Sequence, residues 1–244
     1  MQRAIAYFLL LLGLFTISAQ AALVSGPMIS HIDMREAKIW IQVDAPSLVR
    51  IAYSVVGDSD SLHWTPPVET NSSLANTAVL TLDKIEPGFN YNYWVELNGE
   101  IVTSPAKFTS PANYHGRTPP PNFKVAVGGA HYVIEEGFEP PYQILGDGYS
   151  IFSAITETQP NLMIWAGNTA HLRKSDWTTQ SGYLKRYAMA RSIPDLQLLL
   201  QSIPHYATWG EKDFGAPNGG MNSAYREIAE SSFKCYWPRP VVVS

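Results

Sequence analysis

Residues 161–214 read NLMIWAGNTAHLRKSDWTTQSGYLKRYAMARSIPDLQLLLQSIPHYATWGEKDF, and they set the fold class of the second half of the chain. The segment begins with the buried-strand pattern NLMIWAGN, passes through two helical patterns and ends in a second short strand, HYATWG. Ser192-Ile193-Pro194-Asp195 is a start signal for the second helix, because proline fits the first helical turn. This order predicts parallel neighbouring strands with helices packed on the sheet.

The same alternation begins further upstream. FKVAVGG at residues 123–129 predicts a strand, and YSIFSAITETQP at residues 149–160 predicts a helix. Ligands bind outside the carboxyl ends of the strands in such sheets, so three strand ends should converge on one crevice: Gly128-Gly129-Ala130, Gly167-Asn168 and Gly210 to Asp213. None of the three matches a Walker A, dinucleotide-binding or Gly-x-Ser-x-Gly pattern.

The preceding part of the chain is rich in strand patterns. Alternating apolar residues with many β-branched and aromatic side chains occupy residues 37–44, 48–56, 77–85 and 91–97. Several short strands separated by turns predict an all-β sandwich. LDKIEPGFNYNYWVEL at residues 82–97 resembles one corner of a fibronectin type III domain, in which a tyrosine at the place of Tyr91 bonds back to the backbone. Two roles are open for this module: packing and positioning, or carbohydrate or protein binding.

The amino-terminal segment and a proline-rich segment near the middle of the chain predict its domain organisation. Residues 1–21 combine Arg3, an apolar run and the small residues Ala19-Gln20-Ala21, which is typical of a secretory signal cleaved before Ala22. TSPANYHGRTPPPN at residues 109–122 is rich in proline and predicts a linker, which we place at residues 111–122. We therefore expect a signal peptide (1–21), a sandwich domain (22–110), the linker (111–122) and an α/β domain (123–244). The mature product should be exported, with no membrane span after cleavage.

The composition indicates a folded globular protein and argues against a nucleic-acid-binding one. The 244 residues are 45% hydrophobic and 16% charged, as in folded globular proteins. The net charge of −4 and the absence of a dense Lys/Arg patch argue against nucleic acid as a main partner. The single cysteine, Cys235, excludes an intrachain disulfide.

The α/β region resembles a known family at its loops. GGAHYVIEEGFEPPY, PNLMIWAGNTAHLRKSDW, the run from Gly182 to Asn218, and FKCYW together resemble the PhoD-like, or alkaline phosphatase D, metallophosphatases. The resemblance covers Phe123 to about Trp237 and implies a partial metallophosphoesterase-type domain after a sandwich. It also implies hydrolysis of phosphate mono- or diesters with divalent or trivalent metal ions such as iron and calcium. Such cations activate water and stabilise the in-line transition state.

The sequence departs from the family pattern at the expected ligands. Gly128-Gly129-Ala130 replaces Gly-Ser-Cys, and Gly167-Asn168 with His171 replaces Gly-Asp with a later tyrosine. Trp209-Gly210-Glu211-Lys212-Asp213 replaces Trp-Asp-Asp-His-Asp. The family also continues beyond the equivalent of Ser244 with further histidine and acidic ligands, so we expect a fragment or a degenerate copy.

Three functional interpretations stay open. An enzyme would use an altered metal-ligand set: Asn168, His171, Glu211, Asp213, Asn218 and His131, with Asn168, His171 and Asp213 as catalytic candidates. An inactive scaffold would bind a protein or a phosphate-like anion through Arg173 and Lys212. A decayed remnant would have no ligand. An arginine at the start of a surface helix, such as Arg173, more often forms a plain ion pair, and adjacent Glu135 and Glu136 are interpreted as solvated.

Overall fold

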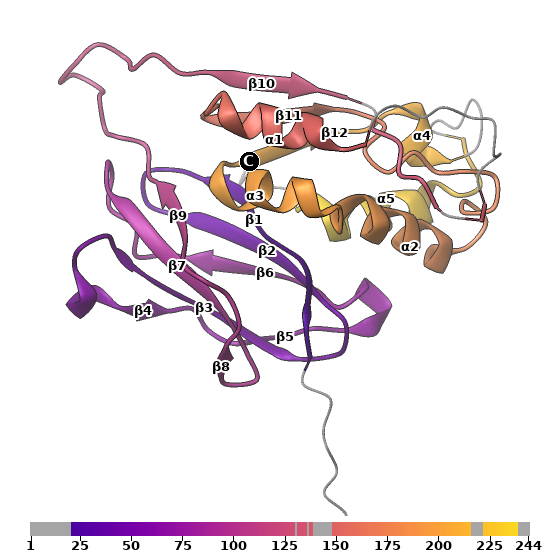
Figure 1. Cartoon of the computed structure of the whole chain (residues 1–244), viewed down its shortest axis with the longest axis horizontal. Helices are drawn as coiled ribbons and strands as arrows, with labels where there is room; N and C mark the ends of the chain where they lie inside the picture. Colours follow the sequence, from indigo (N-terminus) through magenta and orange to yellow (C-terminus); the bar gives the residue numbers. More distant parts are fainter. Residues whose placement is uncertain (1–20, 130, 136, 139–147, 216–221, 239–244) are drawn as a thin grey trace, which may run out of the picture.

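The computed structural model describes residues 21–129, 131–135, 137–138, 148–215 and 222–238 (Figure 1). An antiparallel β-sandwich, called here the sandwich, occupies residues 23–109, and an α/β layer occupies residues 125–236. Residues 111–124 between them carry no helix or strand. Within the described ranges, no helix combines the length and the apolar character needed to cross a membrane.

The sandwich consists of two antiparallel sheets. The first sheet has the order β1-β2-β6 and the second the order β4-β3-β7-β8, with β5 also pairing with β3 and β9 with β7. The strands are β1 (Leu23–Ile32), β2 (Ala37–Val43), β3 (Leu48–Val55), β4 (His63–Trp64), β5 (Val68–Glu69), β6 (Thr77–Leu82), β7 (Asn90–Leu97), β8 (Glu100–Ile101) and β9 (Ala106–Thr109). Two short 3-10 turns, η1 (Ser59–Ser61) and η2 (Ser72–Leu74), lie in the connections.

Alternation along these strands builds one core between the sheets. Ile39 and Ile41 of β2 and Ile51 of β3 are fully buried, because every second side chain points inward. The predicted backbone tie of Tyr91 is confirmed: its hydroxyl accepts the backbone N–H of Glu86 at 2.7 Å, with the ring 1% exposed.

The α/β layer contains the predicted parallel sheet. Strands β10 (Val125–Gly128), β11 (Leu162–Ala166) and β12 (His205–Thr208) pair in that order, and both pairings are parallel. The helices are α1 (Ser150–Glu157), α2 (Gln180–Arg191), α3 (Pro194–Ser202), α4 (Glu211–Phe214) and α5 (Arg226–Tyr236). The strand and helix order predicted between residues 123 and 210 is therefore confirmed, including the start of α3 at Pro194.

The two faces of the parallel sheet differ. Met163, Trp165 and His205 point to one face and are 1–3% exposed among the helices. Val127 pairs with Ile164 on the opposite face, where these side chains are 66% and 38% exposed. Parallel sheets are usually covered on both faces. The described residues cover one face and leave the other apolar and open.

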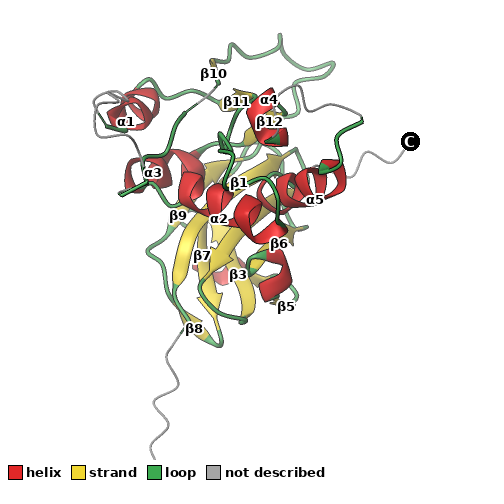
Figure 2. Ribbon diagram, turned by 90° about the vertical axis from the view of Figure 1, so that its right-hand side faces the viewer, coloured by secondary structure: helices red, strands yellow, loops and turns green. Residues whose placement is uncertain are grey.

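Helices α2, α3 and α5 lie between the parallel sheet and the sandwich (Figure 2). Met28 and Trp40, on the outer face of the first sheet, belong to the same apolar cluster as the helices. The Trp40 indole Nε1–H donates to the Cys235 carbonyl at 2.6 Å. The Ser25 hydroxyl donates to the carbonyl of Arg191, a fully buried arginine, at 2.8 Å. The sandwich and the α/β layer therefore share a continuous packed interface.

Candidate functional site

The three strand ends meet at one edge of the parallel sheet. Gly128 of β10 pairs with Trp165 of β11, and Trp165 pairs with Ala207 of β12, so the chain leaves all three strands on the same side (Figure 1). The loops that follow begin at Gly129, Gly167 and Trp209. The predicted convergence of these loops is confirmed. This edge is the candidate site.

Two glycines allow the backbones to approach closely. Gly167 has φ +92°, and a Cβ there would lie 2.9 Å from the backbone of Gly210. A Cβ on Gly210 would lie 2.2 Å from Oδ1 of Asn168 and 2.5 Å from its backbone nitrogen. Any side chain at residue 210 would therefore collide with Asn168. Residue 210 is the position where the family pattern expects an aspartate.

Asn168 is turned back into this junction. Its φ of +56° places it in the left-handed region, which asparagine tolerates better than most residues. Its Oδ1 accepts the backbone N–H of Lys212 at 2.8 Å. The carboxamide thus ties the loop after β11 to the first turn of α4.

Asp213 is the most heavily bonded carboxylate of the site. Oδ1 accepts the backbone N–H of Thr169 at 2.8 Å, the Thr169 hydroxyl at 3.1 Å, the Ala170 N–H at 3.1 Å and the Tyr187 hydroxyl at 3.3 Å. Oδ2 accepts the Gly210 N–H at 2.8 Å. The residue is 0% exposed. Its carboxylate holds the ends of β11 and β12 together from inside.

Tyr187 completes this buried group from helix α2. Burial, together with the charge of Asp213, raises the pKa of Tyr187 well above its ordinary value. The phenol therefore keeps its proton and serves as a donor to Asp213. Thr169, besides its bond to Asp213, accepts the indole N–H of Trp237 at 3.0 Å. Sequence reasoning named neither Thr169 nor Tyr187 as a site residue, although Tyr187 lies within the run from Gly182 to Asn218 that carries the family resemblance.

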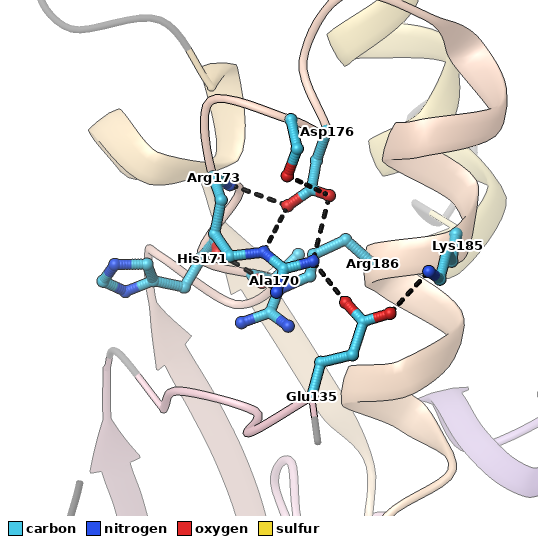
Figure 3. Close-up of polar contacts among 8 residues, drawn as sticks. Glu135, Ala170, His171, Arg173, Asp176, Lys185 and Arg186 are labelled. Atoms are coloured by element: carbon cyan, nitrogen blue, oxygen red, sulfur yellow. Dashed lines mark hydrogen bonds and ion pairs between the residues drawn. The ribbon is translucent and has the colours of Figure 1, made fainter. Parts of the chain in front are cut away.

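Arg173 lies in an ion-pair cluster beside the strand ends (Figure 3). Its Nε donates to Oδ2 of Asp176 at 2.9 Å and its Nη2 to Oδ1 at 3.2 Å, while Nη2 also pairs with Glu135. Lys185 binds the second Glu135 oxygen at 2.5 Å. Glu135 was interpreted as solvated, and this is wrong: its side chain is 13% exposed because two cations from distant segments enclose it.

The charges of this cluster shift the pKa values of its members. Hydrogen bonds from Lys185 and Arg173 hold the pKa of Glu135 below its ordinary value. Burial raises the pKa of Asp176, but hydrogen bonds from Arg173 outweigh it and the net shift is downward. The bond to Asp176 in turn raises the pKa of Arg173. All three groups stay charged at neutral pH.

The other predicted residues lie at the rim or beneath it. The His171 ring packs edge-on against Tyr132, with centroids 4.9 Å apart, and in Figure 3 it points away from the ion-pair cluster. Glu211 and Lys212 face solvent, with a 3.9 Å contact between their charged atoms and side chains 55% and 38% exposed. His131 packs under the loops against Phe152 and Trp165, where burial and then Arg191 lower its pKa to about 4.

The side chains near the strand ends can be compared with the ligand set that the expected metal ions would need. Among the described ranges of the chain, no group of three or more His, Cys, Asp or Glu side chains is arranged to hold a metal ion. Asn218 and Ala130 lie outside the described residues, so the ligand prediction for Asn218 stays a prediction. Of the remaining predicted ligands, Asn168 and Asp213 each bond across the β11–β12 junction, to the Lys212 N–H and the Thr169 N–H, while the His171 ring packs on Tyr132 and Glu211 faces solvent.

Comparison with solved structures identifies the fold. The structure of PhoD aligns with 91% of this chain and 46% of the PhoD chain, with 13% identity and a TM-score of 0.65. This chain therefore has a PhoD-like fold and spans less than half of the length of PhoD. The sensor domain of the anti-sigma factor RsgI4 from Pseudobacteroides cellulosolvens aligns with 38% of this chain and 91% of its own, with 16% identity and a TM-score of 0.33. The fn3 domain of human collagen alpha-1(XX) aligns with 41% of this chain and 95% of its own, with 14% identity and a TM-score of 0.28.

Sequence comparisons add one match. Residues 20–115, which include the whole sandwich, match the family model of a domain of unknown function, DUF7800. A search of curated proteins finds no sequence that matches the chain.

Proposed function

We propose that this chain is an exported protein with a PhoD-like fold whose strand-end loops form a non-catalytic scaffold. The observation that carries this proposal is the bonding of Asp213. An ionised carboxylate offers about four lone-pair sites. Asp213 already accepts five hydrogen bonds, four of them on Oδ1, while fully buried. Among the described residues Oδ2 accepts one hydrogen bond, from the Gly210 N–H, so a cation would have to reach Oδ2 by opening the packing that leaves Asp213 0% exposed.

The geometry of Asn168 supports the same proposal. A bridging metal ligand has to present its oxygen to the crevice, and the Asn168 oxygen instead accepts the Lys212 N–H. Gly210 cannot regain an acidic side chain while Asn168 occupies this position. The replaced residues at 168 and 210 therefore fit each other as a pair, and their arrangement does not fit a shared metal site.

The ligand class that we propose for this edge is a phosphate-like anion or a protein. Lys212 offers a cation at the mouth of the strand ends, and among the described residues its ammonium group pairs with Glu211 alone, at a long 3.9 Å. Arg173 would bind an anion only by exchanging it against Asp176 or Glu135, since both carboxylates hold its guanidinium. We therefore assign Lys212 the anion contact and Arg173 the task of joining the three surrounding segments.

Metal-dependent phosphoester hydrolysis is the competing function. It would require Asn168, His171, Glu211, Asp213 and Asn218 to gather around iron, calcium or similar ions, as the family resemblance implies. The test is hydrolysis of p-nitrophenyl phosphate and bis(p-nitrophenyl) phosphate by the full mature chain, with iron, calcium, zinc and manganese supplied in turn. We expect no turnover beyond that of the Asp213→Asn variant. Turnover that disappears in His171→Ala would refute the scaffold proposal.

The export part of the proposal has support at the start of the sandwich. The Ala22 backbone nitrogen lies 2.8 Å from Oδ1 of Asp44. Cleavage before Ala22 would turn this nitrogen into an ammonium group already placed beside a carboxylate. Amino-terminal sequencing of the exported product should begin at Ala22. Recovery of a product that retains residues 1–21 would contradict the proposal.

We also propose the organisation in which a fibronectin type III-like domain (22–110) is joined through a linker (111–122) to a partial metallophosphatase-type domain (123–244). The Tyr91 bond supports the first assignment. Limited proteolysis should cut first within residues 111–122, where the described chain carries no helix or strand. First cleavage inside the sandwich would contradict this division.

A further inference from the structure

A second candidate site lies on the sandwich and is independent of the function proposed above. We propose that the outer face of β4, β3 and β7 is a platform that binds the sugar rings of a carbohydrate chain. Trp64 of β4 pairs with Ala52 of β3, and Ala52 pairs with Trp94 of β7. Directly paired residues of neighbouring strands point to the same face of a sheet. The two tryptophans therefore flank a small residue in one row across the sheet.

This face is open to solvent, unlike the outer face of the first sheet. Helices α2, α3 and α5 cover the side of the sandwich formed by β1 and β2, whereas β3 and β4 lie on the side away from these helices (Figure 1). Trp64 is 40% exposed, while Ala52 between the tryptophans is 2% exposed. Side chains next to Ala52 thus cover it and form a surface above it. Two strand spacings separate the tryptophans by about 10 Å, which suits contacts with two sugars of one chain.

The polar groups beside the tryptophans are already fixed in place. Arg50 donates from Nε to Oε1 of Glu96 at 2.7 Å and from Nη2 to Oε2 at 2.9 Å. Its Cζ also lies 4.6 Å from the centre of the Trp64 ring, so the guanidinium covers one face of that ring and a sugar would have to use the other. No described residue accepts a hydrogen bond from the third nitrogen, Nη1. A donor held in this way loses little entropy when a ligand binds.

The indole N–H groups point to the same conclusion. Three tryptophans of the core donate to protein acceptors: Trp40 to Cys235, Trp165 to His205 and Trp237 to Thr169. Trp64 and Trp94, like the partly buried Trp177 and Trp209, have no such acceptor among the residues that the structure describes. Their N–H groups and Arg50 Nη1 are donors available to a ligand at the edges of an aromatic surface.

These features fit a neutral, polar ligand with apolar faces. The Arg50 charge is balanced by Glu96, so the row offers no net charge to attract an anion or a cation. A lipid or an apolar peptide would leave the three donors unpaired, which costs free energy. A sugar ring presents C–H groups on its faces and hydroxyl oxygens at its rim. It can therefore stack on a tryptophan and accept hydrogen bonds at the same time.

The test is calorimetric titration of the full mature chain with cellohexaose, chitohexaose and laminarihexaose. We expect at least one hexaose to bind, and Trp64→Ala and Trp94→Ala each to weaken binding roughly tenfold, as for the loss of one stacking ring. Phe89→Ala is the matched control, because Phe89 is an aromatic residue of the same sandwich that is 48% exposed outside the row. It should leave binding unchanged.

Two outcomes would overturn the inference. One is the absence of binding by all three hexaoses. The other is binding that survives in the Trp64→Ala and Trp94→Ala double variant, as would occur with a site elsewhere. Thermal unfolding checks that each variant is folded, and Trp94→Phe replaces Trp94→Ala if the latter does not fold. Because phenylalanine keeps an aromatic face but lacks the N–H donor, Trp94→Phe should weaken binding less than Trp64→Ala does, by about threefold.

Discussion

Asn168 and Gly210 face each other across the ends of β11 and β12, and the Asn168 carboxamide fills the space that a side chain at residue 210 would need. A Cβ at residue 210 would lie 2.2 Å from Oδ1 of Asn168, and the same oxygen accepts the Lys212 N–H at 2.8 Å. The two residues thus form one structural unit. This unit stands where the family pattern places two acidic ligands.

Gly210→Ala should be strongly destabilising. The new Cβ would overlap both the side chain and the backbone of Asn168, so the β11 and β12 ends would have to separate. We expect a loss of about 3 kcal/mol in the free energy of unfolding, measured by urea denaturation. Gly129→Ala is the control, because its Cβ would meet nothing closer than 3.4 Å. Equal losses in the two variants would argue against the close approach.

Asp213→Asn should destabilise the chain although it preserves the shape of the side chain. One carboxylate oxygen becomes an NH₂ group, which would face N–H and hydroxyl donors. The expected loss is about 3 kcal/mol, because charge-assisted bonds disappear and buried donors are left unpaired. Glu211→Gln in the same helix, α4, is the matched control and should change stability little, since its side chain is 55% exposed. An unchanged free energy of unfolding in Asp213→Asn would contradict the scaffold role.

Acid should weaken the ion-pair cluster around Arg173. The pKa values of Glu135 and Asp176 are depressed in the folded chain, so the unfolded chain binds protons first as the pH falls. The stability that these pairs contribute is present above the ordinary carboxyl pKa of about 4 and is lost as the pH falls through the depressed values. Arg173→Gln should therefore be less stable than the parent at pH ~7, and the difference should shrink towards pH ~3. A difference independent of pH would show that the pairs do not contribute in this way.

The two faces of the parallel sheet should respond differently to substitution. Met163→Ala removes a side chain that is 1% exposed and should cost about 2–5 kcal/mol. Val127→Thr changes a side chain that is 66% exposed and should stay within about 0.5 kcal/mol. Urea unfolding of both variants measures the contrast. A large loss in Val127→Thr would mean that another segment covers this face in solution.

The parts of the fold that follow from local pattern could be predicted. Apolar alternation located β2, β3, β6 and β7, and Pro194 located the start of α3. β1 was not predicted, because Gly26 and Pro27 interrupt its alternation and its pairing with β2 is what makes it a strand. The interface between the sandwich and the α/β layer could not be predicted either. The strand pattern around Trp40 predicts only a sandwich residue, and its bond to Cys235 forms only in the folded chain.

In the candidate site, too, the features set by local sequence pattern could be predicted, and those set by tertiary packing could not. Parallel strand order was sufficient to bring Gly128, Gly167 and Gly210 to one edge. The donors to Asp213 could not be predicted, because Thr169 and Tyr187 reach it from segments 44 and 26 residues away. The pairing of Glu135 with Lys185 spans 50 residues and depends on tertiary packing.

The metal content per chain tests the central claim most directly. The full mature protein would be purified, offered iron, calcium, zinc and manganese, dialysed and submitted to elemental analysis beside its Asp213→Asn variant. Our account predicts no tightly retained ion in either protein, because the Asp213 carboxylate and the Asn168 carboxamide serve the backbone. Two or more ions retained by the parent and lost by the variant would contradict it and establish a metal centre at the strand ends.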